Sequence, residues 1–142
     1  MAWVRCCGGG TPSVTYPIDL LTYSTWTVDP TASQSIANNG TKYWNMINKT
    51  PRLKANATIE GTFNNMSISS VTVYLEVSVD GNTWDTVITC AGASPSGQTK
   101  FASLAAYANQ ELYIRLRATN TNPNTLNVRA VYSSTTPYLQ IS

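Results

Sequence analysis

Apolar and polar side chains alternate most regularly in the middle of the chain. Apolar residues occupy every second position from Val71 to Val79, and polar or tyrosine residues lie between them. A period of two residues is that of a β-strand with one buried and one solvated face. Asp80, Gly81 and Asn82 follow, and these residue types tolerate the positive φ that a tight hairpin turn requires. The pattern therefore predicts an antiparallel β-hairpin whose second strand begins at residues 83–84.

The same alternation recurs in shorter stretches along the rest of the chain. Between Glu111 and Thr119 it places Ile114 and Leu116 on the buried face. Further strands are predicted over residues 14–21, 22–28, 43–47, 53–63 and 126–132, with an edge strand over 138–142 and one helical turn over 101–108. Strands at this spacing suggest a sandwich, a jelly roll or a barrel. We expect an all-β fold, an antiparallel, jelly-roll-like β-sandwich of about eight strands.

Residues 1–13 differ from this body. A short apolar piece containing Trp3 and Val4 precedes two cysteines, and the three glycines at 8–10 then form a flexible hinge. Two interpretations are open: a frayed terminus, or an extended arm that docks Trp3 and Val4 on a neighbouring subunit. The arm is attractive because leaving the large apolar surface of a tryptophan in water is costly. We expect an N-terminal arm over 1–13 and a β-sandwich domain over 14–142.

The composition narrows the range of partners. Charged residues make up 11% of the 142 residues and the net charge is +2, whereas typical soluble domains are about 25% charged. So small a net charge argues against electrostatic binding to nucleic acid or to a membrane surface. No apolar stretch reaches the roughly 18 to 20 residues that span a bilayer, and no signal-peptide pattern follows Met1. We expect neither a nucleic-acid nor a membrane partner, and no export by a signal peptide.

The residue types available also limit the chemistry. The sequence contains no histidine, which removes the commonest general base and the commonest metal ligand. Cys6, Cys7 and Cys90 supply too few ligands for a zinc site and suit a reducing cytosol. Cys90 falls at a position typical of a small core residue. We therefore expect a non-enzymatic protein with no catalytic residue, no metal site and no cofactor.

Arginines stand on the polar faces of the predicted strands, at positions 115, 117 and 129. If their strands are neighbours, these side chains form an interface patch, since arginine is enriched at protein interfaces. The alternative is structural, with each arginine paired across strands to a glutamate for about 0.2 to 1 kcal/mol per pair. The glutamates available for such pairs are Glu60, Glu76 and Glu111.

Two tyrosines, Tyr74 and Tyr113, also lie on polar faces. Exposed aromatic rings on a sheet can stack on sugar rings or fill a pocket of a partner, whereas a structural role would pack them half-buried against loops. With the arm and the arginines, they complete the predicted set of partner-binding residues. That set is Trp3, Val4, Tyr74, Tyr113, Arg115, Arg117 and Arg129.

Two segments carry a resemblance to a known class of proteins. The stretch Leu75–Trp84 and the strand Leu112–Thr119 together read Ser-x-Asp-Gly-x-x-Trp followed by Tyr-x-Arg-x-Arg. This layout resembles that of small β-sandwich accessory proteins of tailed-bacteriophage virions, and a similar layout occurs in carbohydrate-binding-like sandwiches. The resemblance covers about residues 55 to 135, and the tryptophan-containing start followed by glycines looks like the anchoring arm of phage accessory proteins. It carries over no catalytic residue.

The resemblance implies a virion component, namely a head decoration or cement protein, a head fibre or a tail appendage. Such a protein is made in the host cytoplasm, contacts other capsid or tail proteins, and is expected to be a homo-oligomer. The alternative function is a carbohydrate-binding module, in which aromatic residues stack on glycans. The aromatic residues considered for that role are Trp26, Trp44, Tyr74 and Tyr113.

Overall fold

This computed structural model describes residues 14–63, 69–91, 98–132 and 138–142, and ten β-strands are the main elements of that part of the chain. The strands are β2 (Ile18–Asp19), β3 (Gln34–Ile36), β4 (Gly40–Asn45), β5 (Thr58–Phe63), β6 (Val71–Ser78), β7 (Asp85–Ala91), β8 (Gln98–Ser103), β9 (Tyr113–Asn120), β10 (Leu126–Val128) and β11 (Leu139–Ile141). A short helix, α1 (Leu20–Tyr23), and a 3₁₀ turn at Ala105–Tyr107 complete the described elements. The predicted all-β antiparallel fold is confirmed.

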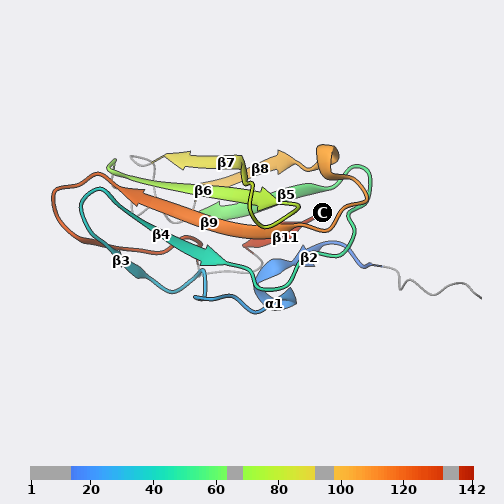
Figure 1. The fold of residues 1–142 in the computed structure, drawn as a ribbon, viewed down its shortest axis with the longest axis horizontal. Coiled ribbons are helices and arrows are strands. Elements are labelled where there is room, and N and C mark those ends of the chain that lie inside the picture. Colours follow the sequence, from blue (N-terminus) through green and yellow to red (C-terminus); the bar gives the residue numbers. More distant parts are fainter. Residues whose placement is uncertain (1–13, 64–68, 92–97, 133–137) are drawn as a thin grey trace, which may run out of the picture.

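The strands form two four-stranded sheets, in the orders β2-β11-β5-β8 and β4-β9-β6-β7, and a two-stranded sheet of β3 and β10. Strands pair from the two ends of the chain inwards. The first described strand, β2, pairs with the last, β11, the second, β3, pairs with the second to last, β10, and so on to the central pair of β6 and β7. The described strands are thus a set of nested hairpins around the β6–β7 turn. Figure 1 shows the β4-β9-β6-β7 sheet in front of the other four-stranded sheet, so the two form layers.

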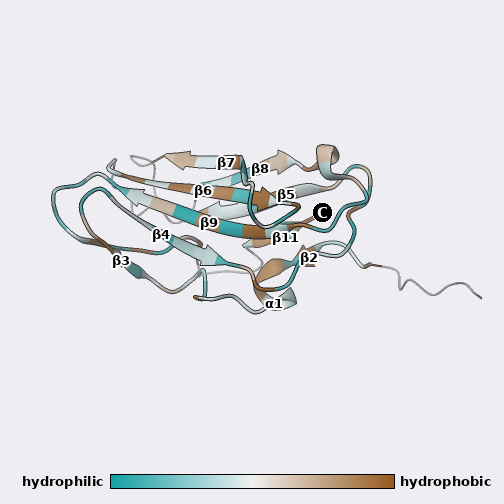
Figure 2. Ribbon diagram, viewed as in Figure 1, coloured by the Kyte–Doolittle hydropathy of each residue, from teal (hydrophilic) through white to brown (hydrophobic). Residues whose placement is uncertain are grey.

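The hydrophobic core is a single cluster with members from both four-stranded sheets. Leu75, Val77, Ile114 and Leu116 belong to it and are fully buried, as the alternation predicts. Each such side chain contributes roughly 1.5 to 3 kcal/mol by leaving water. Figure 2 shows hydrophobic and hydrophilic residues alternating along β9, which is the period that places one face of this strand in the core.

The predicted alternation fails at the end of β6. Glu76 and Ser78, which the pattern places on the solvated face, are buried, and Val79 is 45% exposed. The pairing of β6 with β7 shifts register between Leu75 and Glu76, so this end of the strand is irregular. The strand ends at Ser78, so Val79 already belongs to the turn. The hydroxyl of Ser78 is covered because it accepts a hydrogen bond from the backbone N–H of Gly81 at 2.8 Å.

The hairpin turn itself agrees with the prediction. Gly81 has a φ of +80°, the left-handed region that glycine enters without a steric cost. The Asp80 carboxylate accepts hydrogen bonds from the backbone N–H groups of Thr83 and Asn82, both at 2.8 Å, and these bonds hold the pKa of Asp80 below its ordinary value. The second strand begins at Asp85, slightly later than predicted.

Other predicted elements are shorter or differ in kind. The strand predicted over 22–28 is wrong. Residues 22–23 belong to the helix α1, which the Asp19 carboxylate caps by accepting a hydrogen bond from the Leu21 N–H at 3.0 Å. Residues 24–28 form no named strand, and Trp26 makes only an isolated bridge with Met46. The strands predicted over 14–21, 53–63 and 126–132 shrink to β2, β5 and β10. Most of the helical turn predicted over 101–108 is β8 and a 3₁₀ turn, although Leu104 is buried as expected.

The strand at the C-terminal end is not an edge strand. β11 lies between β2 and β5 and pairs with both, so its neighbours cover its two hydrogen-bonding edges. Leu139 and Ile141 are fully buried in the core. The predicted arm, with Trp3 and Val4, lies outside the described residues. Within the described residues no helix has the length and apolar character needed to cross a membrane.

Candidate functional site

The outward face of the β4-β9-β6-β7 sheet carries a group of arginine and aromatic side chains. We call it the arginine–aromatic face and define it by Tyr43, Tyr74, Glu76, Trp84, Arg115 and Arg117. The two arginines alternate with core residues along β9, the second strand of this sheet, so their side chains point away from the core. Arg117 lies opposite Tyr43 of β4 and Tyr74 of β6, and Arg115 lies opposite Glu76 of β6.

Glu76 joins the two arginines at the centre of this face. Its Oε1 accepts a hydrogen bond from Arg115 Nε at 2.8 Å, and its Oε2 accepts two from Arg117, at 3.1 Å from Nε and 2.9 Å from a terminal nitrogen. The Thr86 hydroxyl donates a further bond to Oε2 at 3.0 Å. Burial alone would raise the pKa of Glu76, but the hydrogen bonds from Arg117, Arg115 and Thr86 outweigh it and leave the pKa below its ordinary value.

Aromatic rings cover the faces of both guanidinium groups. The Arg115 guanidinium carbon lies 4.1 Å from the centre of the Trp84 ring and 4.7 Å from the centre of the Tyr43 ring. The Arg117 guanidinium carbon lies 3.9 Å from the centre of the Tyr74 ring. Each such contact is worth about 0.5 to 2 kcal/mol, depending on how far it is removed from water. The stacking and the Glu76 carboxylate together hold both arginines in fixed positions.

The two arginines keep donors for a partner. Arg115 uses only its Nε in the hydrogen bonds of the described residues, and Arg117 leaves one terminal nitrogen unused. Their side chains are 20% and 24% exposed, and Tyr43 is 40% exposed. Fixed, partly exposed arginine and aromatic side chains are enriched at the centres of protein–protein interfaces.

The predicted site residues are only partly brought together. Tyr74, Arg115 and Arg117 meet on this face. Both arginines form ion pairs with Glu76, so they are paired across strands and are also partly exposed. Tyr113 is the first residue of β9 and lies opposite Ser78. The Nζ atom of Lys49 lies 5.0 Å from the centre of its ring. Arg129 follows β10, which pairs with β3 in the separate two-stranded sheet, so a continuous patch of three arginines does not form.

Two members of the arginine–aromatic face were not predicted. Tyr43 reaches it because β4 pairs with β9, and Trp84 because it precedes β7. The sequence signal that could have found them is an aromatic residue at a polar-face position in or next to a strand. The sequence does not reveal, however, which strands are neighbours. The expectation that Trp44 stacks on a glycan is wrong, because Trp44 is fully buried and its indole N–H donates a hydrogen bond to the Ala32 carbonyl at 3.2 Å.

Metal binding and cysteine chemistry concern other side chains of the described residues. They contain no group of three or more cysteine, aspartate or glutamate residues that could hold a metal ion. Cys90 is buried in the core, as expected, with its Sγ 3.0 Å from Gln98 Oε1. Comparison of the chain with protein-family models, with curated protein sequences and with solved structures found no match.

Proposed function

We propose that this chain is a non-enzymatic structural protein of a tailed-phage virion, a jelly-roll β-sandwich that binds the capsid or tail surface. The observation that carries the proposal is the strand order. When the small β3–β10 sheet is set aside, eight of the described strands remain. Numbered along the chain, they are ordered first-eighth-third-sixth in one sheet and second-seventh-fourth-fifth in the other. An order of this kind is expected when a long hairpin rolls into two sheets, so it supports the proposed jelly roll, an architecture that viral capsid proteins and lectin domains share.

The arginine–aromatic face supports a docking role within that fold. It is the outward side of one sheet, and its arginines are held in place before any partner arrives. Preorganised side chains lose little conformational freedom on binding, which favours affinity. A partner that offers carboxylate or carbonyl oxygens fits the unused guanidinium donors. We place the capsid or tail partner of the proposed virion protein on this face.

The N-terminal segment is a second proposed contact. Its sequence, with Trp3 and Val4 ahead of three glycines, suits an arm that buries an apolar anchor on a neighbouring subunit of a homo-oligomer. The two contacts are separable, since one depends on the sheet and the other on residues 1–13.

Particles of the phage that encodes the chain provide the test. Purified particles should contain the chain in a fixed number of copies by quantitative mass spectrometry, and particles made without it should bind the added protein in a co-sedimentation assay. Tyr43→Ala should weaken this binding by about tenfold, because truncating an interface anchor costs more than about 1 kcal/mol. Phe101→Ala, which truncates an exposed aromatic side chain on the other sheet, is the matched control and should bind normally. Absence of the chain from purified particles would overturn the proposal.

The alternative, a glycan-binding module, is weaker at this face. The Tyr74 ring is stacked by Arg117, and Trp26 is half-buried with its indole N–H bonded to the Leu20 carbonyl at 3.0 Å. A glycan bound to the arginine–aromatic face would have to share the Tyr74 ring with Arg117. In a glycan array, saturable binding that Tyr43→Ala abolishes would favour the alternative over docking to a virion protein.

A further inference from the structure

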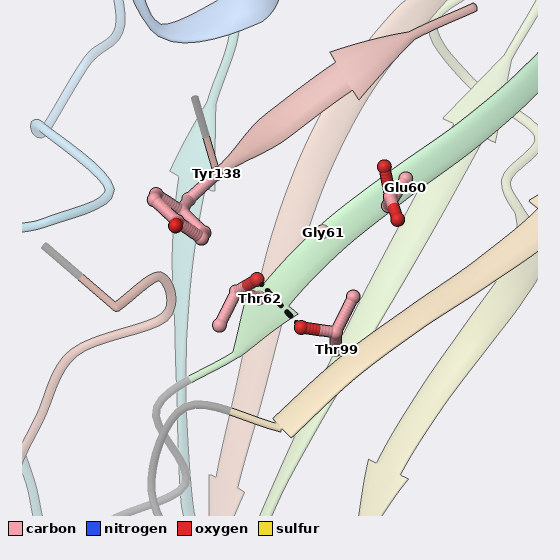
Figure 3. Close-up of a pocket in the computed structure, with 5 residues that line it drawn as sticks. All are labelled: Glu60, Gly61, Thr62, Thr99 and Tyr138. Atoms are coloured by element: carbon pink, nitrogen blue, oxygen red, sulfur yellow. Dashed lines mark hydrogen bonds between the residues drawn. The ribbon is translucent and has the colours of Figure 1, made fainter. Parts of the chain in front are cut away.

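The outward face of the other four-stranded sheet carries a small polar hollow. It has a volume of about 220 Å³ and is lined by Glu60, Gly61, Thr62, Thr99 and Tyr138. Figure 3 shows the side chains of Glu60, Thr62, Thr99 and Tyr138 arranged around it, from β5, β8 and the residue before β11. The hollow is smaller than the roughly 300 to 1,000 Å³ of typical pockets for drug-sized ligands. Its size therefore suits one small ring rather than an extended ligand.

The polar atoms of the hollow can both donate and accept hydrogen bonds. Glu60 Oε1 accepts a bond from Gln140 Nε2 at 3.0 Å, and Oε2 has no partner among the described residues. The hydroxyl oxygens of Thr62 and Thr99 lie 2.9 Å apart, shown as a dashed line in Figure 3. Two hydroxyls carry two hydrogens and their mutual bond uses one, so the pair keeps a donor as well as free lone pairs.

One aromatic ring lines the hollow, and a second, that of Phe101, lies outside its lining but on the same side of the sheet. Tyr138 borders the hollow itself. Phe101 lies directly opposite Glu60 in the β5–β8 pairing, so its side chain leaves the sheet on the same side. Phe101 is 76% exposed, which is the highest value among the large hydrophobic residues of the described chain. A flat apolar surface beside a carboxylate and paired hydroxyls matches the two sides of a sugar ring, with its C–H face and its rim of hydroxyl groups.

We propose that this hollow binds a neutral sugar residue, with Glu60 accepting hydrogen bonds from sugar hydroxyls, Thr62 and Thr99 completing them, and Phe101 packing against the ring. The proposed sugar is not acidic, because Glu60 is the only charged side chain among the described residues that line the hollow, and its carboxylate repels an acidic ligand. The site uses none of the residues of the arginine–aromatic face, so it stands independently of virion docking.

Nuclear magnetic resonance titration of the full chain tests the proposal. The probes are the methyl glycosides of glucose, galactose, mannose and N-acetylglucosamine, with methyl glucuronide as the acidic comparison. At least one neutral glycoside should shift the backbone amide signals of residues 60–62, 99–101 and 138–140 with a millimolar dissociation constant, and the glucuronide should bind more weakly. Glu60→Gln and Phe101→Ala should each weaken binding by about fivefold or more.

Matched variants separate this site from the rest of the molecule. Tyr43→Ala removes an exposed aromatic side chain from the other sheet and should leave glycoside binding unchanged. Thermal melting of each variant establishes that it is folded, and the exposure of Phe101 makes its truncation safe for the fold. The proposal fails if no neutral glycoside shifts these amides up to about 50 mM, a concentration that still detects very weak binding. It also fails if the shifts map to the arginine–aromatic face, or if both hollow variants bind like the unmodified chain.

Discussion

At the scale of single residues, Glu76 has the most distinctive environment in the described chain. It is 4% exposed, yet its carboxylate is fully hydrogen-bonded by two arginines and a threonine. A buried carboxylate without such partners would be strongly destabilising. The side chain also fixes both arginines, so one residue connects the stability of the sheet to the shape of its outward face.

Glu76→Gln should lower the free energy of unfolding by roughly 2 to 3 kcal/mol at neutral pH. This is less than the 3 to 5 kcal/mol of a fully buried pair, because the arginines are partly exposed. Chemical denaturation followed by tryptophan fluorescence gives the value. Thr86→Val, which removes only one of the hydrogen bonds, serves as the comparison and should cost about 1 kcal/mol. Equal losses for the two variants would contradict the central role of Glu76.

The pKa of Glu76 also predicts a dependence of stability on pH. Because the folded state holds this pKa below its ordinary value, the charged carboxylate stabilises the fold at every pH above the ordinary value. That contribution should be lost as the pH falls from the ordinary value of 4.5 through the lowered one. Unfolding measured across this range should show a shallower decline for Glu76→Gln than for the unmodified chain, and parallel curves would exclude the assignment.

Leu116→Ala tests the packing of a single core position. Leu116 is fully buried on β9, so the substitution removes apolar contacts and leaves a cavity in a close-packed core. The expected loss is about 2 to 5 kcal/mol of unfolding free energy. Denaturant titration measures it, and a loss below about 0.5 kcal/mol would mean that the side chain is not in the core.

At the scale of elements, the β6–β7 hairpin is the innermost of the nested pairs and depends on its turn. Gly81 combines a φ of +80° with a close neighbour, since a Cβ built there would lie 3.2 Å from the Tyr113 ring. The turn therefore needs glycine for two reasons: its backbone conformation and the ring of the adjacent strand. Asp80 adds hydrogen bonds to the backbone that reinforce the same geometry.

Gly81→Val should destabilise the protein by more than about 1 kcal/mol, because a β-branched residue at positive φ is strained and its side chain meets Tyr113. A lower melting temperature in differential scanning calorimetry would show the effect. Asn82→Val places the same side chain at the neighbouring exposed turn position and should be much milder. If Gly81→Val melts with the unmodified chain, the turn does not require the left-handed conformation.

At the scale of the whole molecule, the nested pairing separates the outward faces of two sheets. One carries the arginine–aromatic face and the other carries the polar hollow with Phe101. The protein partner and the neutral sugar that we propose would therefore bind on different faces of the molecule. The proposed arm over residues 1–13 is a third element, whose role rests on its sequence.

Deletion of residues 1–10 should leave the melting temperature nearly unchanged but weaken self-association or assembly onto particles, because the glycines uncouple Trp3 from the first strand. Trp3→Ala should reproduce much of that loss, because it removes apolar surface whose burial stabilises the contact by roughly 25 cal/mol per Å². Analytical ultracentrifugation and co-sedimentation measure the two effects. The anchoring role fails if the truncated chain unfolds while each folded molecule still binds as before.

The sequence by itself determined the features that depend on neighbours along the chain. Period-two alternation identified β6 and β9 and their buried faces, and the residues after β6 identified the turn at Gly81, because side-chain direction and turn geometry are set within a few residues. Tertiary structure alone decided what depends on strands far apart in the chain. It placed β11 inside a sheet, brought Tyr43 beside Arg115, buried Glu76 between two arginines and moved Arg129 away from them. Local patterns do not encode which strands pair, since pairing is selected by the free energy of burying the whole core at once.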